Sequence, residues 1–235
     1  MVATETEQAE FVEGSVADLS GRIFLSVQRL NEVINDILNI SLIEANEMRL
    51  QQEPVNLADI INAAMQELNP AKNNRKLNIT LEALDTLPTF IGDKNRLRQA
   101  FWNILSNAIK YTPDGGSIEV KGWLSRTPPP EGEVLVSTFR PGEDGIIILV
   151  KDTGIGIDRL EQKDIFKHFY TAGDTTYHSS NKTAFGGGGI GLGLPITRGI
   201  IEAHGGRVWV ESEGRDPVNY PGSRFYVLLP LKSAR

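Results

Sequence analysis

The 235-residue sequence predicts an α+β fold, a two-layer α/β sandwich preceded by a long helix of a helical bundle. Three observations predict it. Apolar residues repeat at helical spacing over residues 12–46, and helical and strand patterns then interleave without a regular strand–helix–strand repeat. A glycine-rich run at residues 186–193 leads directly into another helical pattern. We therefore divide the chain into a helical region, 1–52, and a domain, 53–235, with a mixed, mostly antiparallel sheet and helices on one face.

The first helical pattern forms a heptad seam. Its positions alternate by four and three residues: Val12, Val16, Leu19, Ile23, Ser26, Leu30, Val33, Ile37 and Ile40. A seam of this length is typical of a coiled coil or a bundle helix, and an amphipathic helix packed on its own domain is the alternative. Gly14 and Gly21 each weaken a helix by about 1 kcal/mol. We therefore expect residues 1–9 to be frayed and the first half of the helix to be frayed or broken.

The second domain contains alternating helical and strand patterns. Pro54 favours an extended linker over 53–57, before a helix at 57–68. We predict further helices at 93–109 and 192–204 and a short one near 162–169. Strands are predicted at 77–83, 116–123, 133–139, 146–150, 207–211 and 223–230. Residues 159–189 otherwise read as a long loop, and a loop of that length is more often functional than idle.

Composition excludes several classes of function. The net charge is −6 and no dense Lys/Arg run is present, so we expect no nucleic-acid partner. The chain has no cysteine, which excludes disulfides and thiolate chemistry, and its three histidines do not form a metal-ligand spacing. No apolar run reaches the roughly 18 residues of a membrane span. We expect a cytoplasmic chain without membrane contact of its own, although a longer parent could be membrane-anchored.

Three segments suggest a site for an anionic ligand. The run from Gly186 to Leu194 has glycines that let backbone N–H groups approach phosphate oxygens, although a plain surface loop is the alternative. Asp152 follows a predicted strand, where its carboxylate could accept a hydrogen bond from an adenine amine; a simple Asp-Gly turn is the alternative. Asn103 and Asn107 share one helix face and could present an oxygen to Mg²⁺, although such a pair is often only solvated.

In chain order these segments closely resemble the conserved boxes of sensor histidine kinases. They are Asn107–Pro113, Asp152–Gly156, Ile165–Tyr170, Gly189–Leu194 and Gly222–Phe225. Residues 30–38 and 43–45 also resemble the second helix of that family's dimerisation hairpin. The catalytic domain of these kinases belongs to a wider group that includes gyrase, Hsp90 and the mismatch-repair ATPases.

The resemblance implies an ATP·Mg²⁺ site. By it, Asn107 coordinates Mg²⁺, Asn103 supports the metal–phosphate site and Lys110 touches phosphate. Asp152 accepts from the adenine amine. The rest of the implied nucleotide-binding set comprises Tyr111 in the pocket, Gly154 and Gly156 as lid hinges, Phe169 with Phe166 as lid anchors, Gly189, Gly191 and Gly193 around the phosphates, and Leu192, Leu194 and Ser223.

The implied activity is that of a histidine kinase. The γ-phosphate would pass to a His and then to an Asp in the receiver domain of a response regulator, and the first helix would form a homodimer. No His followed by an acidic residue occurs in the helical region, so we expect the acceptor to lie outside this chain. Asn103 stands where hydrolysing relatives carry a Glu, which favours transfer over hydrolysis. The alternatives are an ATPase, a non-phosphorylating kinase-like regulator of the same fold, or a non-catalytic scaffold.

Overall fold

The structure is a computed structural model that describes residues 3–129, 144–170 and 191–231; in the first helix it describes the side chains from Asp18 onward, except those of Leu25 and Arg29. The predicted strand at 133–139 and the predicted phosphate-binding Gly189 lie outside the described residues.

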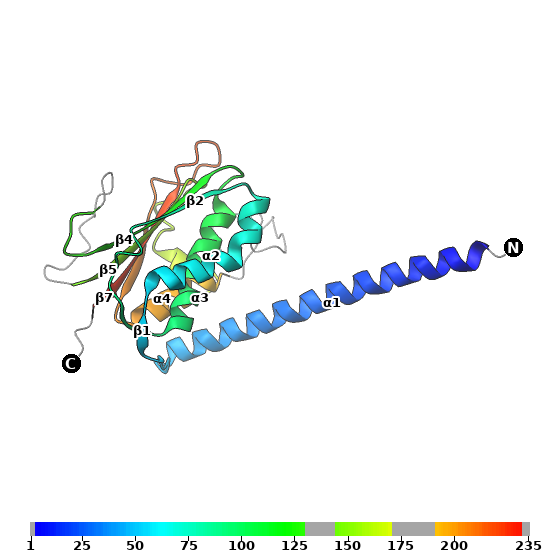
Figure 1. Cartoon of the computed structure of the whole chain (residues 1–235), viewed down its shortest axis with the longest axis horizontal. Coiled ribbons are helices and arrows are strands. Elements are labelled where there is room, and N and C mark those ends of the chain that lie inside the picture. The colour runs from blue at the N-terminus through cyan, green and yellow to red at the C-terminus, as the bar shows by residue number, and fades with distance from the viewer. Residues whose placement is uncertain (1–2, 130–143, 171–190, 232–235) are drawn as a thin grey trace.

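The first helix, α1 (Ala3–Glu44), is a straight rod that projects from the rest of the molecule (Figure 1). It runs unbroken from Ala3 through Gly14 and Gly21, so the expected fraying and breakage were wrong. The residues between the glycines have ordinary helix propensities, and a local cost of about 1 kcal/mol at each glycine does not end a helix.

A five-stranded sheet forms one layer of the second domain. Its order is β2 (Asn78–Glu82), β4 (Ser117–Leu124), β5 (Gly145–Asp152), β7 (Ser223–Pro230) and β6 (Arg207–Glu211). The β2–β4 pair is parallel and the other pairs are antiparallel. This confirms the mixed, mostly antiparallel sheet. A separate ribbon pairs β1 (Glu53–Val55) with β3 (Phe90–Gly92), a strand that the sequence did not predict.

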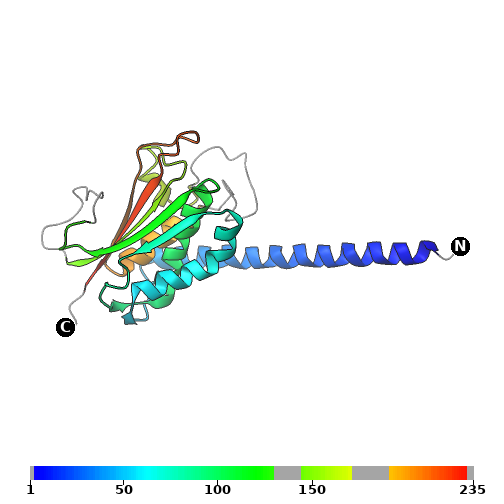
Figure 2. The same cartoon turned by 45° about the horizontal axis from the view of Figure 1, so that its top comes forward.

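Three helices cover one face of that sheet, as Figures 1 and 2 show. They are α2 (Leu57–Asn74), α3 (Lys94–Tyr111) and α4 (Gly193–Ala203). The predicted short helix is a 3-10 turn, η1 (Asp164–Phe166). Helix α2 continues past the predicted end at Leu68 with Pro70 inside it.

The core lies between the sheet and these helices. In β5 the residues Ile146, Ile148 and Val150 point toward the helices and are fully buried or nearly so. On α3, Leu97, Phe101 and Ile104 meet them. The opposite face of α3 therefore remains available for polar side chains.

The C-terminal turns of α1 contact the second domain. Arg96 Nη1 on α3 donates to Asn39 Oδ1 at 2.6 Å, and His168 Nδ1 lies 3.1 Å from Glu44 Oε1. Ile43 packs so tightly on Gly199 of α4 that a Cβ added there would lie 2.5 Å from the Ile43 side chain. These contacts attach α1 beside α4.

Candidate nucleotide-binding site

An open cavity of about 170 Å³ lies where α3, the end of β5, η1 and the start of α4 meet. Most of the site residues expected from the sequence line it: Asn103, Asn107, Lys110, Tyr111, Asp152, Gly156, Gly191, Leu192, Gly193, Leu194 and Ser223. The structure thus brings together residues that are more than 100 positions apart in the chain.

Asp152 is the buried acid of the cavity, with 5% of its surface exposed. Its Oδ1 accepts hydrogen bonds from Gly154 N at 2.8 Å and Ser223 N at 3.3 Å. Burial raises the pKa of Asp152 to about 7, although both backbone hydrogen bonds act in the opposite direction. Within the described part of the chain no group donates to Oδ2, so this oxygen can accept a hydrogen bond from a ligand.

Gly154 is not among the residues that line the cavity but packs against two that are, Tyr111 and Asp152. A Cβ at this position would lie 2.5 Å from Tyr111 O and 2.7 Å from Asp152 Oδ1. Ile155 N donates to Tyr111 O at 3.1 Å, which ties the loop after β5 to the end of α3. The absence of a side chain at Gly154 therefore lets the acid and the end of α3 come close together.

Helix α3 presents polar side chains to the cavity. Asn107 is half-buried, and its side chain makes no hydrogen bond to any other part of the chain that the structure describes. Asn103 Nδ2, in contrast, donates to Gly193 O at 3.0 Å and to Thr197 Oγ1 at 3.4 Å. Asn103 thus fixes the start of α4, while the Asn107 amide is available to a ligand.

Lys110 and Tyr111 close the end of α3. Lys110 is buried, and its Nζ lies 4.6 Å from the centroid of the Tyr111 ring. This cation–π contact positions an ammonium group in the cavity lining. A buried cation there suits an anionic ligand.

The N-terminus of α4 also faces the cavity. Gly191 has a φ of +75°, and its carbonyl accepts from Phe169 N at 3.1 Å. Leu192 precedes the helix without any side-chain cap, so the first N–H groups of α4 are not used by a capping side chain. N–H groups without a side-chain cap and the helix dipole together favour negative charge at this point.

Phe169 differs from the expectation. Its side chain is 64% exposed and is not part of the cavity lining, whereas the next residue, Tyr170, is. A positive φ of 60° at Phe169 turns the chain, which directs the two neighbouring side chains apart. Phe166 is buried, consistent with an anchoring position.

Several lining residues were not predicted from the sequence. Three of them, Ile155, Ile157 and Tyr170, lie within or next to the segments that resemble the kinase boxes. Their position in the sequence could therefore have indicated that they belong to the site. Arg215, in the β6–β7 loop, and Glu32, Val33 and Asp36, on α1, carried no such signal. Only the tertiary structure brings them to the site.

No group of three or more His, Asp or Glu side chains that could bind a metal occurs within residues 3–129, 144–170 and 191–231. An Mg²⁺ ion that arrives with a nucleotide does not need one, since it retains waters and phosphate oxygens as ligands. The unengaged Asn107 amide fits such an ion.

Comparison with known proteins decides the family. Residues 92–233 match the family described as "Histidine kinase-, DNA gyrase B-, and HSP90-like ATPase". The chain belongs to this family. Its matched residues include all the cavity residues from α3, β5, α4 and β7.

Relatives with similar sequences are sensor kinases. The chain is 30% identical over 96% of its length to the alginate biosynthesis sensor protein KinB of Pseudomonas aeruginosa, and covers 32% of that protein. It is 35% identical over 87% of its length to the circadian input-output histidine kinase CikA of Synechococcus elongatus, covering 24% of it. The chain thus spans about a third or less of these relatives.

Solved structures support the fold. Acinetobacter baumannii histidine kinase AdeS aligns with a TM-score of 0.62 at 21% identity, over 88% of this chain and 81% of that one. Full-length ShkA in complex with AMPPNP aligns with a TM-score of 0.65 at 23% identity, over 88% of this chain and 37% of that one.

None of the helices in the described ranges has the length and hydropathy to cross a membrane.

Proposed function

We propose that this chain binds ATP with Mg²⁺ and transfers the γ-phosphate to a histidine that the chain itself does not supply. The observation that carries the proposal is the Asp152 carboxylate. It is buried, held by two backbone N–H groups, and has one oxygen open to the cavity. An exocyclic amine of a purine is a donor that such an oxygen would accept.

The phosphates would lie at the other end of the cavity. Lys110, the N-terminus of α4 and the glycines Gly191 and Gly193 offer positive charge and N–H groups there. Asn107 would coordinate Mg²⁺, which supplies electrostatic stabilisation of the phosphoryl group when bound. The same arrangement orients the γ-phosphate toward an incoming nucleophile.

Two further steps extend this proposal to signalling. The phosphohistidine would pass its phosphoryl group to an Asp in a response-regulator receiver domain, as the sensor-kinase names of the relatives suggest. Two copies would pair through α1, because Leu19, Ile23 and Leu30 on this helix are more than half exposed.

An ATPase or a non-phosphorylating regulator with the same fold is the second candidate. Asn103 argues against hydrolysis, because its amide cannot act as a base toward water. Its Nδ2 is also engaged with Gly193 and Thr197 on α4. We therefore assign Asn103 a positioning role beside the phosphates.

The test measures bound nucleotide and ADP formation together, with labelled ATP and Mg²⁺. We expect bound ATP with almost no ADP, and phosphate transfer only when a histidine-bearing acceptor helix is added. Asn107→Ala should lower Mg²⁺-dependent ATP affinity by roughly tenfold or more. The control is Asn95→Ala, which removes an exposed Asn from the first turn of the same helix. Steady ADP release by the unmodified chain would instead establish a hydrolase.

A further inference from the structure

The loop between β6 and β7, residues 212–222, is bound tightly to the loop that follows Asp152. Asp216 N donates to Ile155 O at 2.8 Å, and Gly222 N donates to Gly154 O at 2.9 Å. Gly156 and Arg215 form an isolated antiparallel bridge. The backbone of Arg215 is therefore fixed against the end of the cavity that contains Asp152.

A second set of hydrogen bonds fixes the ends of this loop. Ser212 Oγ accepts from Ile157 N at 3.0 Å and donates to Gly222 O at 2.7 Å. Gln162 Nε2 donates to Ser212 O at 2.7 Å. Such a network holds the loop without any apolar core of its own.

The acid next to Arg215 is already engaged. Asp216 Oδ1 accepts from Val218 N at 2.7 Å and Asn219 N at 3.0 Å, and Oδ2 accepts from Asn219 Nδ2 at 2.6 Å. These bonds commit Asp216 to its own turn. Asp216 therefore does not pair with the neighbouring guanidinium.

The Arg215 side chain lines the cavity and forms no hydrogen bond or ion pair with the rest of the chain that the structure describes. Other arginines around the domain do have partners. Arg159 Nε donates to Glu213 O at 3.1 Å, and Arg126 pairs with Asp144 at 3.3 Å. An exposed guanidinium at the cavity rim, on a rigid backbone, is available to a ligand.

The position of Arg215 indicates which end of a nucleotide it would contact. Its bridge partner, Gly156, belongs to the loop that begins at Asp152, the proposed base-binding acid. The groups that we propose to bind the phosphates are Lys110 and the N-terminus of α4, and they belong to helices α3 and α4 instead. A guanidinium is planar and stacks well on the face of an aromatic ring.

Building on the proposed function, we infer that Arg215 binds the nucleoside end of ATP by packing its guanidinium on the purine base. It thus acts as an additional nucleotide-binding residue, outside the segments that resemble the kinase boxes. Asp152 would read the amine edge of the base, and Arg215 would cover one face of it.

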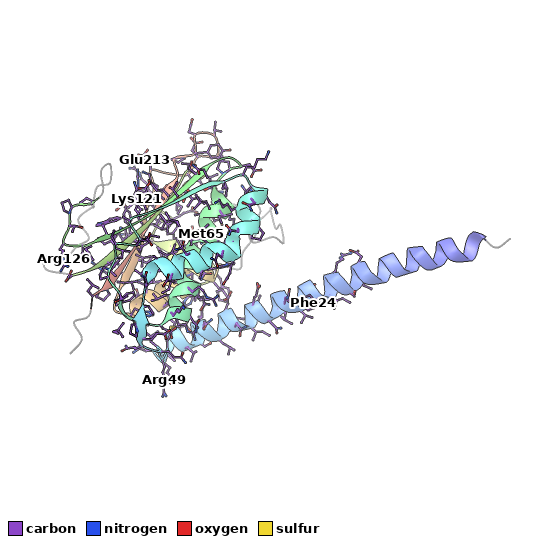
Figure 3. The ribbon with its side chains drawn as sticks, in the orientation of Figure 1. Phe24, Arg49, Met65, Lys121, Arg126 and Glu213 are labelled. Atoms are coloured by element: carbon purple, nitrogen blue, oxygen red, sulfur yellow. The ribbon has the colours of Figure 1, made fainter. Side chains whose placement is uncertain are left out.

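The experiment measures the dissociation constants of adenosine, ADP and ATP with Mg²⁺ by calorimetry on the full chain. We expect Arg215→Ala to weaken all three ligands by the same factor, roughly threefold to tenfold. Arg215→Lys should recover only part of this loss, since an ammonium group stacks less well. The control is Arg126→Ala, which removes the same charge from the loop after β4. Figure 3 labels Arg126 apart from Glu213, which stands two positions before Arg215 in the sequence.

Two results would overturn the inference. Unchanged affinities would make Arg215 an ordinary surface residue. A loss that is absent for adenosine and largest for ATP would assign it to the phosphates instead. Failure of the unmodified chain to bind any of the three ligands would refute the proposed function itself, and is thus distinguishable from both.

Discussion

The cavity has two walls that are attached to the molecule in different ways. The domain wall, made by α3, the end of β5, η1 and the start of α4, rests on side chains such as Ile104 and Ile200 that have no exposed surface. The α1 wall consists of Glu32, Val33 and Asp36. Its helix contacts the domain at Asn39, Ile43 and Glu44, in the last turns.

This difference means that nucleotide binding and the position of α1 depend on different parts of the structure. Apart from Arg215 in the β6–β7 loop, the groups that we assign to the adenine amine, the phosphates and Mg²⁺ lie in the domain wall, and the packing of this wall fixes their geometry. The α1 wall adds two acidic residues and belongs to a helix whose apolar side chains remain largely exposed. A change in the position of α1 could therefore alter the cavity without disturbing the domain.

The largest expected contrast concerns stability. Ile104 is fully buried in α3, and Ile34 on α1 is 46% exposed. We expect Ile104→Ala to lower the free energy of unfolding by about 2–5 kcal/mol, because it leaves a cavity under the binding site. Ile34→Ala, the same change in another helix, should cost under about 1 kcal/mol. Urea unfolding followed by tryptophan fluorescence reports on the domain, since Trp102, Trp123 and Trp209 all lie there.

Equal losses for the two isoleucine variants would contradict the comparison. They would mean that α1 and the domain unfold as one unit despite their small contact.

The next effect concerns the pH dependence of binding in the domain wall. Because the pKa of Asp152 is raised to about 7, the acid is largely protonated at pH 6 and largely ionised at pH 8. If the ionised form accepts the adenine amine, adenosine affinity should fall about tenfold from pH 8 to pH 6. Adenosine is the suitable probe, since it has no phosphate that titrates in this range. Asp152→Asn should remove the pH dependence, and a dependence that persists in this variant would assign it to another group.

Ionisation of Asp152, which should favour adenosine binding, should lower the stability of the folded domain. Its folded pKa of about 7 exceeds the ordinary value of 3.8, so the folded state binds the proton more tightly. Its contribution to stability is therefore complete below about pH 4 and is lost as the pH rises through 7. In the absence of nucleotide, Asp152→Asn should consequently stabilise the domain at pH 8 more than at pH 5.

The sequence predicted the domain wall well, because local signals mark its parts. Asp93, which accepts from Asn95 N and Arg96 N, marks the start of α3, and the regular strand patterns of β6 and β7 gave their bounds correctly. The kinase-like segments then identified most of the lining residues. The sequence predicted Phe169 as a nucleotide-binding residue, whereas the next residue, Tyr170, lines the cavity. The positive φ at Phe169 that causes this difference cannot be predicted from side-chain spacing.

The α1 wall and Arg215 could not be predicted in this way. The heptad pattern of α1 shows an apolar seam, but it does not show which helix face meets the domain. Acidic residues four positions apart, such as Glu32 and Asp36, are typical of an ordinary solvent-exposed helix face. Arg215 reaches the site through backbone pairing of its loop with residues 154–156, and backbone pairing carries no sequence signal.

The smallest expected effect tests the attachment of α1. In Gly199→Ala the new Cβ would lie 2.5–2.7 Å from three atoms of the Ile43 side chain, so Ile43 must shift. We expect the end of α1 to shift with it. Alanine also favours helix α4 by roughly 1 kcal/mol, and the domain should therefore remain folded. Moving Glu32 and Asp36 of the cavity lining away from an anionic nucleotide should raise ATP affinity about twofold to fivefold and leave the affinity for uncharged adenosine unchanged. Adding Ile43→Ala makes room for the new methyl group and should restore the original affinity. Weaker ATP binding in Gly199→Ala would show instead that the α1 wall contributes favourable contacts to the nucleotide.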